Sequence, residues 1–105
     1  MVKRGDIWLV RLEPTLGSEI RKTRPCMIIS PDGLSHLSNH VIAPLTSHSH
    51  PTRFQPAIEF EGKAGLILLD QIRTESRLRL VRRLGAARPE ELAAALSGLR
   101  EMFED

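Results

Sequence analysis

The chain has 105 residues, of which 41% are hydrophobic, and it carries 15 Lys and Arg against 13 Asp and Glu. This length fits one domain over residues 1–105, so it excludes Rossmann, kinase and large barrel enzymes, and enzymes with a separate cofactor domain. The single Cys26 excludes a disulfide within the chain, and no charged leader or long apolar run marks a signal peptide or a membrane span. We therefore expect a cytoplasmic protein.

Two apolar segments near the N-terminus are predicted to be strands. Residues 6–12 (DIWLVRL) combine aromatic and β-branched residues and end at the turn-forming pair Glu13-Pro14. Residues 25–30 (PCMIIS) are predicted to form a second, buried strand, because Pro25 disfavours a helical conformation at the residue before it. That residue is Arg24, which therefore lies where a loop becomes a strand.

More strands are predicted after the turn at residues 31–33 and a helical turn over 34–39. A polar loop is expected to open at Thr46, and a polar, arginine-rich turn is expected between Arg73 and residue 80. The predicted strands are 40–45 (HVIAPL), 57–60 (AIEF), 66–70 (LILLD) and 80–84 (LVRRL).

One long helix is predicted to begin at Pro89, since proline is favoured at the first helical position and Glu90 and Glu91 complement the positive helix end. Gly98 lies inside this helix, where glycine costs about 1 kcal/mol relative to alanine. The expected apolar stripe is Leu92, Leu96, Leu99 and Phe103. The expected fold is mainly β, a small antiparallel barrel covered by a C-terminal helix.

The net charge of +2 conceals an asymmetry along the chain. Residues 1–88 carry 14 basic and 8 acidic residues, whereas residues 89–105 carry 1 basic and 5 acidic residues. Arginine accounts for 12 of the 15 basic residues, and its planar guanidinium suits phosphates and base edges. A nucleic-acid partner is therefore a reasonable hypothesis, although an arginine-rich face can also be simply solvated.

The four histidines suggest two kinds of site, and the sequence disfavours both. His48 and His50 lie in a Ser, Thr and Pro loop, where a solvated role is favoured over acid–base catalysis. A zinc site shared with Cys26 lacks the closely paired ligands that structural zinc sites need. The chain also contains no P-loop and no GxSxG element, so we expect no metal and no cofactor.

Polar residues gather instead at the ends of the predicted strands. They are Glu19, Arg24, Thr46, Ser47, Asp70, Gln71 and Arg73. The ends of strands can converge in a small barrel, and an arginine beside a hydroxyl and a proton acceptor is the minimum set that stabilises a charged phosphorane. Cleavage of RNA needs no metal when the ribose 2′-hydroxyl is the nucleophile. Each residue could also serve only as a turn cap or a surface ion pair, so spacing alone gives weak support for a site.

Five short motifs in a fixed order resemble the MazF/PemK toxins over residues 4 to 84. They are Arg4-Gly5-Asp6, the run from Leu12 to Glu19, Arg24-Pro25, Pro44-Leu45-Thr46-Ser47 and Asp70-Gln71-Ile72-Arg73-Thr74. Each motif is unspecific alone, but their order and spacing in a chain of this length make coincidence improbable.

The resemblance implies a homodimeric SH3-like barrel of the kind shared with the CcdB gyrase poisons. It further implies a sequence-specific, metal-independent endoribonuclease toxin of a type II toxin–antitoxin system. Such a toxin cleaves single-stranded RNA, leaves a 2′,3′-cyclic phosphate and a 5′-hydroxyl, and is blocked by a small acidic antitoxin.

Carried over by position, the resemblance makes Arg24 and Thr46 catalytic. Arg24 would stabilise the phosphorane or donate a proton, and Thr46 would position the scissile phosphate. Glu19 is the candidate proton acceptor. The candidate RNA-binding residues are Ser47, Arg53, Asp70, Gln71 and Arg73, since exposed bases are read by hydrogen bonds and arginine stacking.

Two alternative functions stay open on the sequence. The same barrel could act without catalysis as a CcdB-like inhibitor of DNA gyrase, because a fold does not fix a function. The chain could also be an inactive toxin, because Ile20 stands where the family commonly has Gln after Gly-Ser-Glu.

Overall fold

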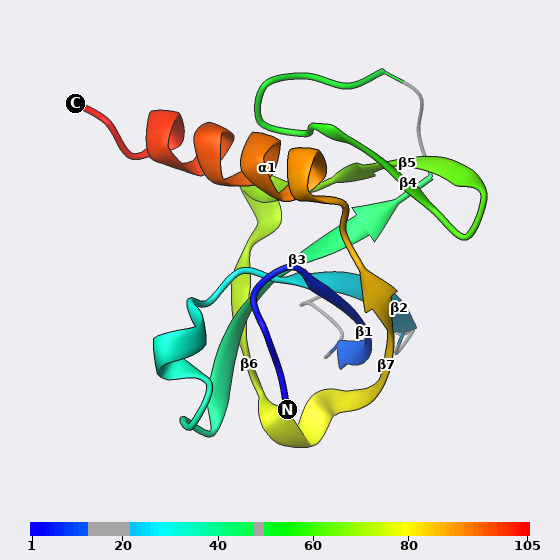
Figure 1. Cartoon of the computed structure of the whole chain (residues 1–105), viewed down its shortest axis with the longest axis vertical. Coiled ribbons are helices and arrows are strands. Elements are labelled where there is room, and N and C mark those ends of the chain that lie inside the picture. The colour runs from blue at the N-terminus through cyan, green and yellow to red at the C-terminus, as the bar shows by residue number, and fades with distance from the viewer. Residues whose placement is uncertain (13–21, 48–49) are drawn as a thin grey trace, which may run out of the picture.

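A computed structural model describes residues 1–12, 22–47 and 50–105, and its strands form one mostly sequential antiparallel sheet (Figure 1). Neighbouring strands in the sheet follow the order β4-β5-β3-β2-β1-β7. Strand β6 is not in this series and pairs with β3. The strands are β1 (Asp6–Leu12), β2 (Lys22–Ile28), β3 (Asn39–Thr46), β4 (Ala57–Phe60), β5 (Lys63–Ile67), β6 (Arg73–Ser76) and β7 (Leu80–Ala86). One helix, α1 (Pro89–Met102), follows them. The expected mainly β fold with a C-terminal helix is confirmed.

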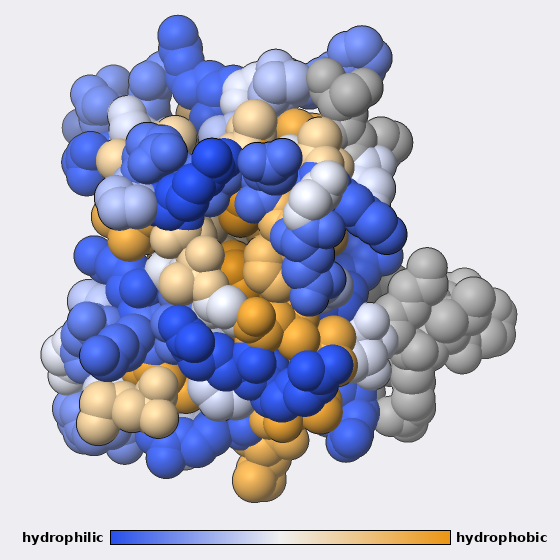
Figure 2. All heavy atoms as spheres, turned by 45° about the vertical axis from the view of Figure 1, so that its right-hand side comes forward, coloured by the Kyte–Doolittle hydropathy of each residue, from blue (hydrophilic) through white to orange (hydrophobic). Residues whose placement is uncertain are grey.

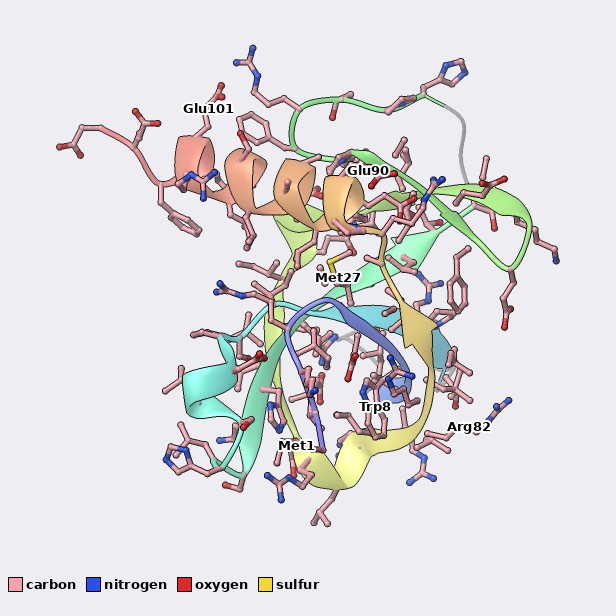
Figure 3. The ribbon with its side chains drawn as sticks, viewed as in Figure 1. Met1, Trp8, Met27, Arg82, Glu90 and Glu101 are labelled. Carbon is pink, nitrogen blue, oxygen red and sulfur yellow. The ribbon has the colours of Figure 1, made fainter. Side chains whose placement is uncertain are left out.

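The C-terminal half of the central strand β2 is buried on both of its faces, because Cys26, Met27 and Ile28 are each at most 1% exposed. Alternate side chains of a strand point to opposite faces. Met27 belongs to one apolar cluster and packs with Ala95 of α1, whereas Cys26 and Ile28 belong to a second cluster with Val10. Figure 3 shows Met27 between the sheet and α1, and Trp8 within the ring of strands below. The sheet therefore separates two cores.

The helix packs through its small residues, not through the predicted leucine stripe alone. Ala95 and Gly98 are buried, while the predicted stripe residue Phe103 is 72% exposed. A Cβ on Gly98 would lie 2.7 Å from the carbonyl oxygen of Arg53 and 2.7 Å from Cδ1 of Leu69. Glycine at this position therefore lets the helix approach the loop before β4, which offsets its low helix propensity.

Several sequence-based boundaries are wrong. The strand predicted over 25–30 is β2, which begins at Lys22, so Arg24 lies inside a strand and pairs with Val10, not where a loop becomes a strand. The helical turn predicted over 34–39 is a 3₁₀ turn at Asp32–Leu34.

The strand predicted over 66–70 is β5, which begins at Lys63 and ends at Ile67, and Asp70 lies in a following 3₁₀ turn over Leu69–Gln71. The segment after Gln71, predicted to be a turn, contains a strand, because Arg73–Ser76 forms β6 and pairs with β3. Its inward side chains are charged, so apolar alternation does not reveal it.

Hydrophilic residues cover most of the face shown in Figure 2, with hydrophobic residues exposed in patches between them. The most exposed large hydrophobic side chains of the described residues include Met1, Leu78 and Phe103. In the described part of the chain, the one long helix is too short and too polar to cross a bilayer.

Candidate active site

The register of β2 and β3 brings the two residues expected to be catalytic to one end of the sheet. Cys26 pairs with Pro44, and the two antiparallel strands run on toward Arg24 and Thr46. Continued by two residues, this register puts Arg24 opposite Thr46, with both side chains on the same face. Both residues are half-buried. The pairing of β2 with β3 therefore places Arg24 and Thr46, 22 positions apart in the sequence, at the same end of this strand pair.

A pocket of about 220 Å³ opens beside Thr46 and Ser47. Its other walls come from β2 and from the hairpin of β4 and β5, whose two turn residues Glu61 and Gly62 both have positive φ, at 54° and 77°. Positive φ at both positions suits the tight turn that joins two twisted strands. The pocket is lined by Pro25, Leu45, Thr46, Ser47, Ile58, Phe60, Glu61, Lys63, Ala64 and Gly65.

Gly65 lies directly against the backbone of Thr46. The strands β3 and β5 pair at Thr46 and Leu66. A Cβ on Gly65 would lie 2.5 Å from the carbonyl oxygen of Thr46, which is closer than any side chain tolerates. Glycine here lets the hairpin reach the end of β3, and so it helps to fix where Thr46 and Ser47 lie.

A cluster of charges surrounds the buried thiol of Cys26. Burial raises the pKa of the Cys26 thiol to about 12, and the positive charge of Arg24 lowers this pKa in part. The charges of Glu75 and Arg73 also act on this thiol, Glu75 raising its pKa and Arg73 lowering it. The thiol is therefore protonated at neutral pH and is no nucleophile. Arg24, Arg73 and Glu75 therefore each lie close enough to Cys26 to act on its thiol.

Arg73 is held by an ion pair inside β6. Its Nε lies 2.6 Å from Oε2 of Glu75, and its side chain is 34% exposed. The two preceding candidates lie on the 3₁₀ turn: Gln71 is exposed, and the Asp70 carboxylate accepts a hydrogen bond from Gln55 at 3.1 Å. Asp70 therefore pairs with Gln55, and Arg73 pairs with Glu75.

The other candidates fall in different places. Arg53 is exposed and forms an ion pair with Glu101 of α1, whose side chain Figure 3 shows pointing away from the sheet. Glu19 and His48 lie outside the described residues. His50 is exposed, whereas His40 is buried to 1% exposure. Within the described ranges, no three His, Cys, Asp or Glu side chains gather as metal ligands would.

Sequence reasoning missed the pairing of His40 with Glu75 across β3 and β6. Burial lowers the pKa of His40, and the charge of Arg77 lowers it further. Nε2 of His40 and Oε2 of Glu75 are the buried side-chain atoms of the described residues that lack a hydrogen-bond partner. No motif links the two residues, since only strand pairing brings them together.

Comparison with known proteins gives the same family as the motifs. A family model described as PemK-like, MazF-like toxin of type II toxin–antitoxin system matches residues 3–103. MazF from Deinococcus radiodurans is similar in structure, with 23% identity, a TM-score of 0.79, and coverage of 96% of this chain and 94% of that chain. An endoribonuclease from a mycobacterial species, solved with its cognate antitoxin, has 20% identity, a TM-score of 0.78, and coverage of 96% and 93%.

The Mycobacterium tuberculosis toxin MazF-mt6 is also similar, with 19% identity, a TM-score of 0.77, and coverage of 93% of this chain and 95% of that chain. Identities this low establish a common fold, and the family model supplies the membership. The chain belongs to the PemK-like, MazF-like toxin family of type II toxin–antitoxin systems.

Proposed function

We propose that this protein is an endoribonuclease toxin that cleaves single-stranded RNA without a metal ion. The observation that carries the proposal is the pairing of β2 with β3, which ends at Cys26 and Pro44, two residues short of Arg24 and Thr46. A fixed guanidinium stabilises the charge that develops on a phosphorane, and a neighbouring hydroxyl can hold a phosphate oxygen. Family membership and the relative described as an endoribonuclease support the same activity.

In the proposed reaction, the ribose 2′-oxygen attacks the adjacent phosphorus and the bond from phosphorus to the 5′-oxygen breaks. One proton leaves the 2′-hydroxyl and another joins the departing 5′-oxygen, so the products are a 2′,3′-cyclic phosphate and a 5′-hydroxyl. The RNA supplies its own nucleophile, so the reaction needs no metal-bound water.

The residue roles follow from their chemistry. Arginine keeps its proton at neutral pH, so Arg24 is assigned charge stabilisation, and Thr46 is assigned the positioning of the phosphate. Glu19 is assigned the acceptance of the 2′-hydroxyl proton.

The proposed RNA track runs past the pocket beside Thr46. Ser47 supports this track because it lines the same pocket, and the half-exposed Arg73 supplies a cation near Arg24. Exposed polar side chains suit the reading of single-stranded bases, whose edges are open to hydrogen bonds. The flanking residues proposed to contact RNA are Asp70, Gln71 and Arg53.

The proposal is tested by incubating the purified protein with a long unstructured RNA in excess EDTA and sequencing the new 5′-hydroxyl ends. We expect cuts at one short recurring sequence, and we expect Thr46→Ala to reduce them strongly. Cuts that require added divalent metal would contradict the proposed chemistry. A folded wild-type protein that makes no cuts would contradict the nuclease, and inhibition of DNA supercoiling would then favour the gyrase alternative.

We propose further that the protein binds an acidic antitoxin, as the charge of its residues 1–88 favours an acidic partner. Charge pairing between exposed groups is screened by salt. The dissociation constant of the complex with the cognate antitoxin is expected to rise roughly tenfold between low salt and high salt, as measured by calorimetry. A dissociation constant that salt leaves unchanged would indicate a mainly apolar interface. The homodimer stays a prediction, which sedimentation velocity tests.

A further inference from the structure

Glu75 is a buried carboxylate in contact with arginines. Its side chain is 6% exposed, Oε2 lies 2.6 Å from Nε of Arg73, and Oε1 lies 4.0 Å from Nε of Arg79. Arg73 is more open, with 34% of its side chain exposed. The ion pair is therefore anchored inside the protein at the carboxylate, and its guanidinium reaches toward solvent.

The strand registers put this ion pair on the same face of the sheet as the proposed active site. Glu75 lies opposite His40, and Arg73 lies opposite Ile42. Along β3, side chains two residues apart share a face, so the face of Ile42 is also the face of Thr46. The joint action of Arg24, Arg73 and Glu75 on the Cys26 thiol agrees with this placement.

A contribution to folding stability does not by itself explain why the Glu75 carboxylate is buried. Removing two charges from water costs several kcal/mol per ion, and a buried ion pair is often no more stable than apolar residues of similar volume. Oε2 of Glu75 also lacks a well-aligned hydrogen-bond donor despite its short distance to Nε of Arg73. A geometric role accounts better for a carboxylate at this position.

We propose that Glu75 is a positioning residue that holds the guanidinium of Arg73 toward an RNA phosphate beside Arg24 and Thr46. The proposal rests on the proposed ribonuclease function. The ion pair with Glu75 lies on the Nε side of the guanidinium, and in this proposal the four N–H donors of its two terminal nitrogens serve the RNA. An arginine that is already ordered loses less entropy when it binds a phosphate.

The direction in which Glu75→Gln changes the RNA affinity distinguishes a positioning role of Glu75 from a purely electrostatic one. A negative charge near an RNA site repels phosphates, so neutralising it should strengthen RNA binding. If Glu75 positions Arg73, the variant Glu75→Gln should weaken binding instead. Ordering one long side chain is worth a factor of about 2–10 in affinity, so the expected rise in dissociation constant is about fivefold.

The experiment measures the dissociation constant of an unstructured RNA with 2′-fluoro riboses, which lacks the attacking 2′-hydroxyl. The proteins are wild type, Glu75→Gln, Arg73→Gln and the double variant. Because Glu75 acts through Arg73, the double variant should bind no more weakly than Arg73→Gln alone. With cleavable RNA, Glu75→Gln should raise KM while leaving kcat within about twofold, the pattern of lost ground-state binding.

The matched control is Glu91→Gln, which removes a carboxylate of the same 6% exposure from an ion pair with Arg88 at the start of α1. It should lower the melting temperature without changing RNA affinity. Should Glu75→Gln fail to fold, Glu75→Asp keeps the buried charge but withdraws the carboxylate by one methylene. It should weaken binding about twofold, with the same dependence on Arg73.

The possible failures are distinguishable. Wild-type protein that neither cleaves nor binds RNA overturns the proposed function and the positioning role together. Wild-type protein that cleaves, with Glu75→Gln binding RNA equally or more tightly, overturns the positioning role alone. Additive losses in the double variant, or an equal loss in Glu91→Gln, also overturn it.

Discussion

Replacement of Arg24 by alanine is expected to lower the rate of RNA cleavage by about 10²–10³, the usual effect of losing one preorganised donor to a charged transition state. Arg24 lies on β2, at the end of the strand pair where Thr46 ends β3, so its loss removes the cation from the proposed phosphate position. Single-turnover cleavage of the recognised RNA gives the rate. The loss is expected in kcat as well as in kcat/KM, because the contact strengthens in the transition state.

The control for this variant is Arg100→Ala. Arg100 lies in the last turn of α1, so the control removes the same charge at a distance from the ends of β2 and β3. It should leave the cleavage rate within about twofold, as expected for an exposed residue outside the site. Equal rates for wild type and Arg24→Ala would contradict the proposed site.

Replacement of Gly65 by alanine is expected to lower both stability and activity. The added Cβ would lie 2.5 Å from the carbonyl oxygen of Thr46, so β5 and the end of β3 must move apart. Overpacking of this kind costs about 1–3 kcal/mol. A shift near 1 Å in a positioning group costs up to about 10²-fold in rate, so we expect cleavage to fall by about 10–10²-fold. Thermal unfolding and single-turnover cleavage measure the two effects.

Gly33→Ala is the matched control, because a Cβ on Gly33 meets no atom within 4 Å. It should leave the melting temperature and the cleavage rate close to those of wild type. Gly65→Ala that behaves like Gly33→Ala would contradict the role given to the contact between β5 and Thr46. A loss of stability with full activity would show that the contact supports the fold alone.

Local patterns predict most of the strands and the helix. Apolar runs bounded by proline and glycine residues identify the strands β1 to β4 and β7, because turns and buried strands are encoded by neighbouring residues. Pro89 with Glu90 and Glu91 predicts the start of α1 for the same local reason. The family motifs lie in these elements and in the loops between them, so the amino-acid sequence is sufficient to show the resemblance.

The sequence by itself therefore determined the fold class, the family and the candidate residues Arg24 and Thr46. Tertiary structure decided which residues meet. β6 stayed hidden because Arg73 and Glu75 break its apolar alternation, and only pairing with β3 makes it a strand. The contact of Gly65 with Thr46 and the packing of Gly98 on the Arg53 backbone follow from the approach of distant segments. Such contacts depend on strand register and close packing, which local sequence does not encode.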